Sequence, residues 1–109
     1  MLESLFGSKN AERVLIFLFS REKGYAREIA RFYETEFFPI YKQLERLELG
    51  GILVSHNVGR TREFALNPRY PFLKELKSLL EKALSFYPEE ERENLVMNRR
   101  RPRRSGKKL

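Results

Sequence analysis

Cysteine is absent and histidine occurs once, and both facts narrow the chemistry open to the chain. Without cysteine there can be no disulfide, no thiolate nucleophile and no cysteine-based zinc site. One imidazole, that of His56, does not make a metal site, and we expect it to be an ordinary surface residue. No Ser/His/Asp grouping and no phosphate-cradling glycine loop is present either. The sequence therefore predicts no metal, no cofactor and no enzyme activity.

Long apolar runs are lacking too. The longest, residues 14–19, is far shorter than the roughly 20 residues that a helix needs to cross a bilayer. The first ten residues show no signal-peptide pattern. We therefore expect a cytoplasmic protein without a membrane partner. With 109 residues, 41% of them hydrophobic, the chain has the size and apolar content of one domain.

Positive charge is in excess and lies mainly at the C-terminal end. The chain has 22 basic and 15 acidic residues, a formal net charge of +7. Residues 88–109 hold eight cations and four glutamates, which leaves +3 for residues 1–87. We therefore expect a folded domain over residues 1–87 and a basic, flexible tail over residues 88–109. Such a tail binds phosphates by releasing counterions, but a solubilising tail or one that binds an acidic protein partner fits equally well.

Apolar residues spaced three and four apart predict three helices in the first half of the chain. The first begins at the capping residue Ser8 and ends before Gly24. A short second helix covers residues 25–33. The third has Pro39 in its first turn, where a missing N–H costs nothing, and ends after Leu49 at two glycines.

The period then changes to two, which predicts a β-hairpin. Ile52, Val54, Phe64 and Leu66 form its apolar face, and residues 58–62 form a basic tip around a glycine. A long helix follows over residues 70–86, with an apolar stripe wider than one small core needs. A further helical turn or two is expected through Leu95 and Met97.

This order of elements, together with two segments, resembles the ArsR-like and MarR-like winged helix-turn-helix regulators over about three quarters of the chain. Residues 25–31 (YAREIAR) resemble the second helix of those families. Residues 40–53 (IYKQLERLELGGIL) resemble their recognition helix running through glycine into the first wing strand. The resemblance implies a mainly α fold with a small β-hairpin: a three-helix core, a wing and a long C-terminal helix. It also implies a transcription regulator that binds double-stranded DNA.

A recognition helix needs an apolar side that anchors it and a second side that faces base edges. Ile40, Leu44 and Leu47 supply the anchor. The candidate DNA contacts on the other side are Phe38, Pro39, Tyr41, Lys42 and Arg46. Two alternatives stay open: Phe37, Phe38 and Tyr41 are core residues, and Lys42 and Arg46 form a solvated face in which Arg46 pairs with Glu45 or Glu48.

Phosphate contacts are expected from the second helix and from the wing. Arg27 lies near the start of the second helix and is preferred over Arg31, although pairing with Glu28 or Glu34 is an equal alternative. Arg60 and Arg62 alternate across Thr61, so an extended backbone would place both on one face, toward a minor groove or phosphates.

Regulators of this kind usually act as two-fold dimers that bind two half-sites. The expected dimer interface consists of the surplus leucines of the long helix, together with the first helix: Leu73, Leu76, Leu80 and Leu84. The main alternative is a winged-helix module that binds a protein partner, with the basic tail as a tether. RNA binding is a weaker alternative, because the aromatic residues form no stacking ladder on a strand.

Overall fold

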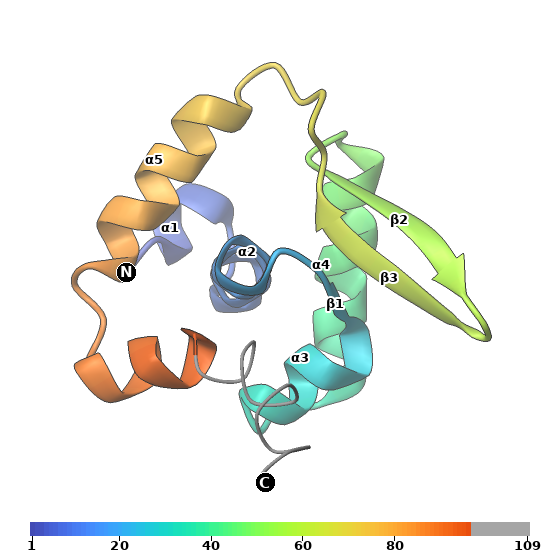
Figure 1. Cartoon of the computed structure of the whole chain (residues 1–109), viewed down its shortest axis with the longest axis horizontal. Coiled ribbons are helices and arrows are strands. Elements are labelled where there is room, and N and C mark those ends of the chain that lie inside the picture. The colour runs from blue at the N-terminus through green and yellow to red at the C-terminus, as the bar shows by residue number, and fades with distance from the viewer. Residues whose placement is uncertain (97–109) are drawn as a thin grey trace, which may run out of the picture.

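The computed structural model describes residues 1–96, and the predicted basic tail and the helical position of Met97 lie outside that range. The elements follow one another as α1 (Glu3–Phe6), α2 (Lys9–Arg21), β1 (Gly24–Tyr25), α3 (Ala26–Phe32), α4 (Phe37–Leu49), β2 (Leu53–Val58), β3 (Thr61–Leu66) and α5 (Leu73–Leu84). Residues 89–96 form one more helical segment. In Figure 1, α2, α3 and α4 occupy the middle, the β2–β3 hairpin projects on one side and α5 lies on the other. None of the helices described in residues 1–96 is long and apolar enough to span a bilayer.

The three predicted helices of the first half are confirmed as α2, α3 and α4. Ser8 caps α2, because its Oγ accepts a hydrogen bond of 2.9 Å from the backbone N–H of Ala11. Pro39 lies in the first turn of α4. The chain leaves α4 through Gly51, whose φ of 82° is accessible to glycine without strain. Local capping and chain-reversal signals therefore set the ends of these helices.

Strand β1 and helix α1 were not predicted. Gly24 of β1 pairs with Phe64 of β3, which makes a three-stranded antiparallel sheet in the order β1-β3-β2. A Cβ atom at position 24 would lie 2.8 Å from Cε1 of Phe17, so only glycine lets the backbone approach the core this closely. A two-residue strand has no periodicity, and the sequence therefore gives no signal for it.

The apolar face of the hairpin was predicted in the wrong phase for β2. Leu53 is fully buried and lies opposite Leu66, whereas Val54 is 38% exposed. The reason is that Ile52 belongs to the turn after α4, where its N–H donates to the carbonyl of Leu47. Alternation therefore starts at Leu53, and a shift of one residue exchanges the two faces of a strand.

The boundary between the domain and the tail lies later than predicted. Leu95 is fully buried in the hydrophobic core. The guanidinium group of Arg21 donates to the carbonyl oxygens of Asn94 and Leu95, at 3.2 and 3.1 Å. Residues 88–96 therefore belong to the folded domain, and the predicted boundary at residue 87 is wrong. The reason is that one leucine among charged residues closes a core that the earlier helices leave open.

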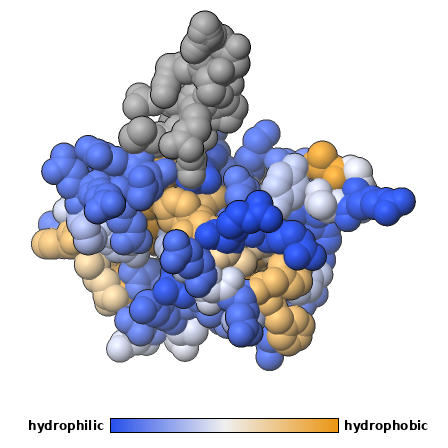
Figure 2. Space-filling view, turned by 90° about the horizontal axis from the view of Figure 1, so that it is seen from below, coloured by the Kyte–Doolittle hydropathy of each residue, from blue (hydrophilic) through white to orange (hydrophobic). Residues whose placement is uncertain are grey.

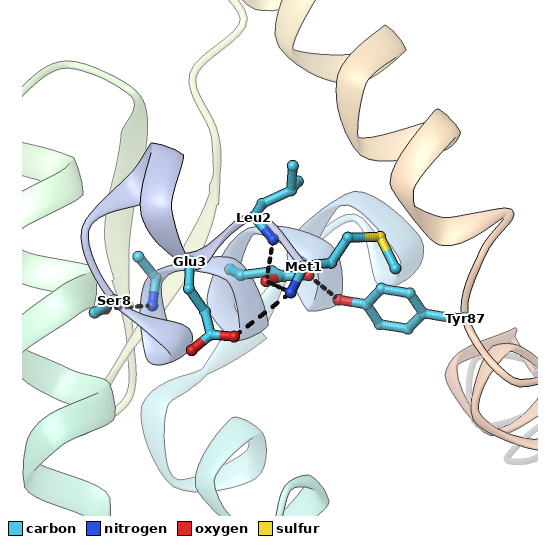
Figure 3. Close-up of polar contacts among 7 residues, drawn as sticks. Met1, Leu2, Glu3, Ser8 and Tyr87 are labelled. Atoms are coloured by element: carbon cyan, nitrogen blue, oxygen red, sulfur yellow. Dashed lines mark hydrogen bonds and ion pairs between the residues drawn. The ribbon is translucent and has the colours of Figure 1, made fainter.

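A buried carboxylate helps to fasten the C-terminal part to α2. Glu12 Oε2 accepts a hydrogen bond of 2.6 Å from the hydroxyl of Tyr87 (Figure 3). Glu12 Oε1 accepts from the backbone N–H of Leu2 at 2.8 Å and from the ammonium group of Met1 at 3.3 Å. Burial alone would raise the pKa of Glu12, but these hydrogen bonds and the ammonium charge together lower it below its ordinary value of 4.5.

Replacing Glu12 with glutamine is expected to lower the free energy of unfolding at neutral pH by about 1–3 kcal/mol, because buried donors lose a charged acceptor. The stabilisation by Glu12 is complete above its ordinary pKa and is lost as pH falls through the lowered pKa of the folded state. Urea unfolding at several pH values checks this. Below about pH 4.5 the wild type should lose stability more steeply than Glu12→Gln. Parallel curves for the two proteins would show that Glu12 does not stabilise the fold through its charge.

Candidate nucleic-acid interface

Helix α4 has the two different sides that a recognition helix requires. Ile40 and Leu44 are fully buried and Leu47 nearly so, which confirms the predicted anchor. The residues on the exposed side are Phe38, Lys42, Glu45, Arg46 and Leu49. The helix is therefore held to the core along one stripe and leaves a mixed polar and apolar side for a partner.

Aromatic rings and cations alternate at the start of α4. Phe38 is 62% exposed, so it is not a core residue, and the Nζ atom of Lys42 lies 5.7 Å from its ring centroid. Phe37 is 37% exposed and stacks on the ring of Tyr41, with centroids 5.5 Å apart. The guanidinium group of Arg27 lies over the ring of Phe37, 4.9 Å from its centroid. Cation–π contacts of this kind hold the two cations beside the first turn of α4.

Arg46 has different partners from those considered in the sequence. Its Nε atom donates to Oε1 of Gln43 at 3.0 Å, and its Nη2 atom donates to the carbonyl of Phe6 in α1 at 3.1 Å. It forms no ion pair with Glu45 or Glu48. Glu45 is exposed, and its side chain has neither a hydrogen bond nor an ion pair within residues 1–96.

Helix α3 contributes two exposed cations, Arg27 and Arg31. Neither forms an ion pair within the described part of the chain. Glu28, one of the partners considered for Arg27, lies 3.6 Å from the guanidinium group of Arg21 and also accepts the backbone N–H of Tyr25. Both α3 cations are therefore available to an external anion.

The wing turns in a two-residue loop, Gly59-Arg60, with positive φ at the glycine. Arg60 is at the tip and exposed, with no ion pair to another residue among 1–96. Arg62 belongs to β3 instead. The prediction that Arg60 and Arg62 share one extended face is wrong. Arg60 lies in the turn between the two strands, whereas Arg62 lies on the strand after it.

Arg62 faces α4 and β2. Its Nη1 atom donates to the hydroxyl of Tyr41 at 3.1 Å, and its Nη2 atom donates to the carboxylate of Glu48 and to Oγ of Ser55, the latter at 3.1 Å. The Oγ atom of Ser55 in turn donates to Glu48 at 2.7 Å. The guanidinium group also lies 5.1 Å from the ring centroid of Phe64. The charge of Arg62 is thus satisfied within the molecule.

His56 lies on β2 and its side chain is 69% exposed. Its Nε2 atom lies 3.1 Å from Oε1 of Glu63, whose other oxygen lies 3.9 Å from Nζ of Lys23. Among residues 1–96, no three His, Cys, Asp or Glu side chains lie together in a way that could hold a metal ion.

An open groove joins the exposed side of α4 to the wing. It is lined by Lys42, Glu45, Arg46, Glu48, Leu49 and Arg62. Figure 2, viewed from the side at which α4 begins, shows a hydrophilic surface with separate apolar patches, and the outermost tip of the hairpin is hydrophilic with an apolar patch beside it. Lys42, Arg46 and Arg62 of β3, the strand that follows Arg60, therefore border one surface.

Glu45 and Glu48 line this surface, but the sequence suggested them as ion-pair partners of Arg46 and not as DNA contacts. Glu48 could not be assigned to Arg62, because their contact depends on how the hairpin packs on α4 rather than on helical spacing. Glu45 did give a signal, because it follows Lys42 by three residues and precedes Leu49 by four, on the same side of the helix.

The cations of this surface are not part of a general positive charge on residues 1–96. All 15 acidic residues and 15 of the 22 basic residues lie within residues 1–96, so this part has no formal net charge. The net charge of +7 belongs to the seven cations of residues 97–109. Any affinity of residues 1–96 for a polyanion must therefore come from the way their cations are arranged, and Arg27, Arg31, Lys42 and Arg60 are exposed cations of the interface side.

The predicted dimer interface on α5 is only partly exposed. Leu80 is fully buried, and Leu76 and Leu84 pack partly against the same core. Leu73 is partly exposed. Three residues spaced seven apart form an outward stripe: Phe72 at the N-cap, Leu79, which is partly exposed like Leu73, and Phe86 just after the helix. Phe72 and Phe86 are 62% and 65% exposed.

The helices α2, α3 and α4, the hairpin packed beside α4 and the following helix α5 define a winged helix, which confirms the predicted fold class. ZitR of Lactococcus lactis, solved in the apo form of a double mutant, superposes with a TM-score of 0.54 at 17% identity, over 91% of this chain and 83% of that chain. The adhesin competence repressor AdcR of Streptococcus pyogenes superposes with a TM-score of 0.56 at 14% identity, over 98% of this chain and 89% of that chain.

At such identities the similarity shows a shared fold. The sequence matches no protein-family model and no curated protein. The roles of individual residues must therefore be argued from this surface and not transferred from the two neighbours.

Proposed function

We propose that this chain is a transcription regulator that binds double-stranded DNA with α4 in the major groove and the wing tip on the adjacent backbone or minor groove. The observation that carries the proposal is the groove shared by Lys42, Arg46 and the wing strand on the exposed side of an otherwise anchored helix. In this geometry the first turns of the recognition helix reach the base edges. One of the two structural neighbours is described as a repressor, which supports the same class of function.

Base contacts are assigned to the outward stripe of α4. Lys42 donates to the O6 and N7 atoms of a guanine, and Phe38, with Pro39, packs on a thymine methyl group. Glu45 accepts from the N4 amino group of a cytosine, which is the contact that a free carboxylate makes in a major groove. Tyr41 and Arg46 are secondary candidates, because the hydroxyl of Tyr41 already accepts from Arg62 and Arg46 already donates to α1.

Phosphate contacts are assigned to Arg27 and Arg31 of α3 and to Arg60 of the wing, which are exposed and free of ion pairs within residues 1–96. Such contacts position the protein without reading sequence. The seven cations beyond residue 96 add affinity for any duplex.

Replacing Arg60 with alanine is expected to weaken binding to all duplexes alike and to reduce the slope of log affinity against log salt by about 1. Titration of a mixed genomic duplex at several salt concentrations measures both quantities. The same titration with a chain that ends at Val96 separates the wing from the basic tail, whose removal should lower the slope further. If Arg60→Ala weakened one duplex sequence and spared the others, the assignment of Arg60 to phosphates would be wrong.

We further propose that the regulator is a homodimer that binds two half-sites, and that the outward stripe of α5 forms its interface. Leu79 lies at the centre of this stripe. Leu79→Glu is expected to give monomers in sedimentation experiments, because an interface core does not tolerate an unpaired carboxylate. Ser78→Glu adds the same charge to the exposed neighbouring position and should leave the dimer intact. A dimer that persists in Leu79→Glu would contradict this interface.

A protein-binding module is the second candidate, and the zero net charge of residues 1–96 favours it. In that case the exposed Phe38 would contact a protein instead of a thymine methyl group. The salt titration distinguishes the two functions. A salt-dependent affinity with a sequence-dependent remainder supports regulation, whereas the absence of duplex affinity at moderate salt supports the module.

A further inference from the structure

The wing is poorly supported beyond its base. Strand β1 pairs with β3 only at Phe64 and Glu63, so the part of the hairpin from Asn57 to the tip has two strands. A two-stranded ribbon has little stability of its own in water. Its residues from Asn57 through Thr61 are also exposed. The direction of the tip must therefore be fixed by contacts near the base.

Arg62 makes the outermost contact between the wing and α4 that the structure contains within residues 1–96. It lies opposite Asn57, one pair beyond the end of the three-stranded part. From there its guanidinium group reaches two side chains of α4, Tyr41 and Glu48, and one of β2, Ser55. The carboxylate of Glu48 is bound a second time by Ser55. Three elements thus meet at one guanidinium group, and the planar fork of arginine fixes their relative directions better than a flexible lysine would.

The contacts that begin at Arg62 extend through Tyr41 to the first turn of α4. The ring of Tyr41 stacks on Phe37, and Phe37 lies under Arg27 of α3. A displacement of Arg62 would therefore remove a hydrogen-bond donor from the tyrosine that packs beside the first turn of α4. The wing and the start of α4 are connected through one side chain.

We propose that Arg62, Glu48 and Tyr41 set the direction of the wing relative to α4, and that Arg62 is a positioning residue while Arg60 carries the charge to DNA. The inference rests on the proposed DNA-binding function. Its physical basis is preorganisation: a tip already held in the bound direction loses less conformational freedom on binding than a free ribbon does. The contact between Arg60 and DNA should accordingly depend on Glu48, although Glu48 itself does not touch DNA.

The test compares Glu48→Ala with Glu45→Ala, each in the full-length protein. Both variants remove one glutamate from the exposed half of α4, but only Glu48 contacts the wing. Tyr41→Phe is a milder variant that removes the acceptor hydroxyl and retains the stacked ring. Two quantities are measured: the NMR order parameters of the backbone amides of residues 57–62 in the free protein, and the loss of duplex affinity caused by Arg60→Ala in the wild-type, Tyr41→Phe and Glu48→Ala backgrounds.

Glu48→Ala should lower the order parameters at the tip from rigid values near 0.85 toward about 0.6, and Glu45→Ala should leave them unchanged. Arg60→Ala should weaken mixed-duplex binding about three- to tenfold in the wild-type background and less than about twofold in the Glu48→Ala background. Tyr41→Phe should give intermediate values for both quantities.

Two results would overturn the inference: a tip equally ordered in Glu48→Ala and Glu45→Ala, or an equal Arg60→Ala effect in the wild-type and Glu48→Ala backgrounds. If none of the proteins, the wild type included, bound duplex, the proposed function would fail instead. The order parameters of the free protein would then still decide whether Glu48 and Arg62 hold the wing.

Discussion

Replacing Leu95 with alanine is expected to lower the free energy of unfolding by about 2–5 kcal/mol, the largest effect of any single change considered for this chain. Leu95 is fully buried, and its removal leaves a cavity beside helices that cannot close without moving. The helical segment 89–96 and its two hydrogen bonds from Arg21 would be weakened together with the core. Equilibrium unfolding in urea, monitored by circular dichroism, measures the change.

Val96→Ala is the matched control for this prediction. Val96 is the next residue on the same helical segment but is 41% exposed, so its truncation should change stability by no more than about 0.5 kcal/mol. If Leu95→Ala were as mild as Val96→Ala, residues 89–96 would not be part of the core. The domain would then end near residue 87, as the sequence alone suggested.

Replacing Lys42 with alanine is expected to cost about 1–3 kcal/mol of binding free energy on a preferred duplex and to relax the preference for sequence. The reason is that Lys42 is the exposed cation nearest the start of α4, and its ammonium group has a cation–π contact but no carboxylate partner in the described residues. A guanine contact formed by this group would contribute discrimination as well as affinity. Fluorescence anisotropy with a preferred and a scrambled duplex measures both.

Lys77→Ala is the control for Lys42→Ala. Lys77 is an exposed lysine of α5, so its replacement removes the same charge from a surface outside the groove. It should weaken both duplexes only slightly and equally. If the two variants behaved alike, Lys42 would contribute general charge and would not read bases.

The parts of the fold that follow from local rules could be predicted from the sequence. Ser8, Pro39 and Gly51 fix helix ends through their own backbone and side-chain chemistry, and the structure agrees with each. The anchoring side of α4 was also predicted correctly, because Ile40, Leu44 and Leu47 repeat at the helical period. Segments of this kind need no knowledge of the rest of the chain.

The parts that depend on distant partners could not be predicted. The face of β2 depends on where the turn after α4 ends, and that is decided by the hydrogen bond from Ile52 to Leu47. Leu95 is buried because it joins a core made of residues far from it in the sequence. Arg62 lies in the same basic stretch of sequence as Arg60, but its side chain pairs with Glu48 of α4. This contact changes its expected role from binding DNA to positioning the wing.

Because residues 1–96 have no formal net charge, the DNA-binding hypothesis cannot rely on a general electrostatic attraction by this part of the chain. Without a general positive field, non-specific attraction by this part of the chain is weak, and binding relies on a few placed cations and on Phe38, Lys42 and Glu45. Removing the basic tail should therefore reduce affinity for random DNA more than it reduces the preference for one sequence. This pattern separates attraction from recognition.

Selection of bound fragments from a random duplex library by the full-length protein tests the central claim most directly. A recognition helix and a dimer predict enrichment of a two-fold repeat with half-site centres about 10–10.5 base pairs apart, or a multiple of that spacing. A library that stays random after selection, with binding that disappears as salt rises, would contradict the claim that α4 reads DNA sequence.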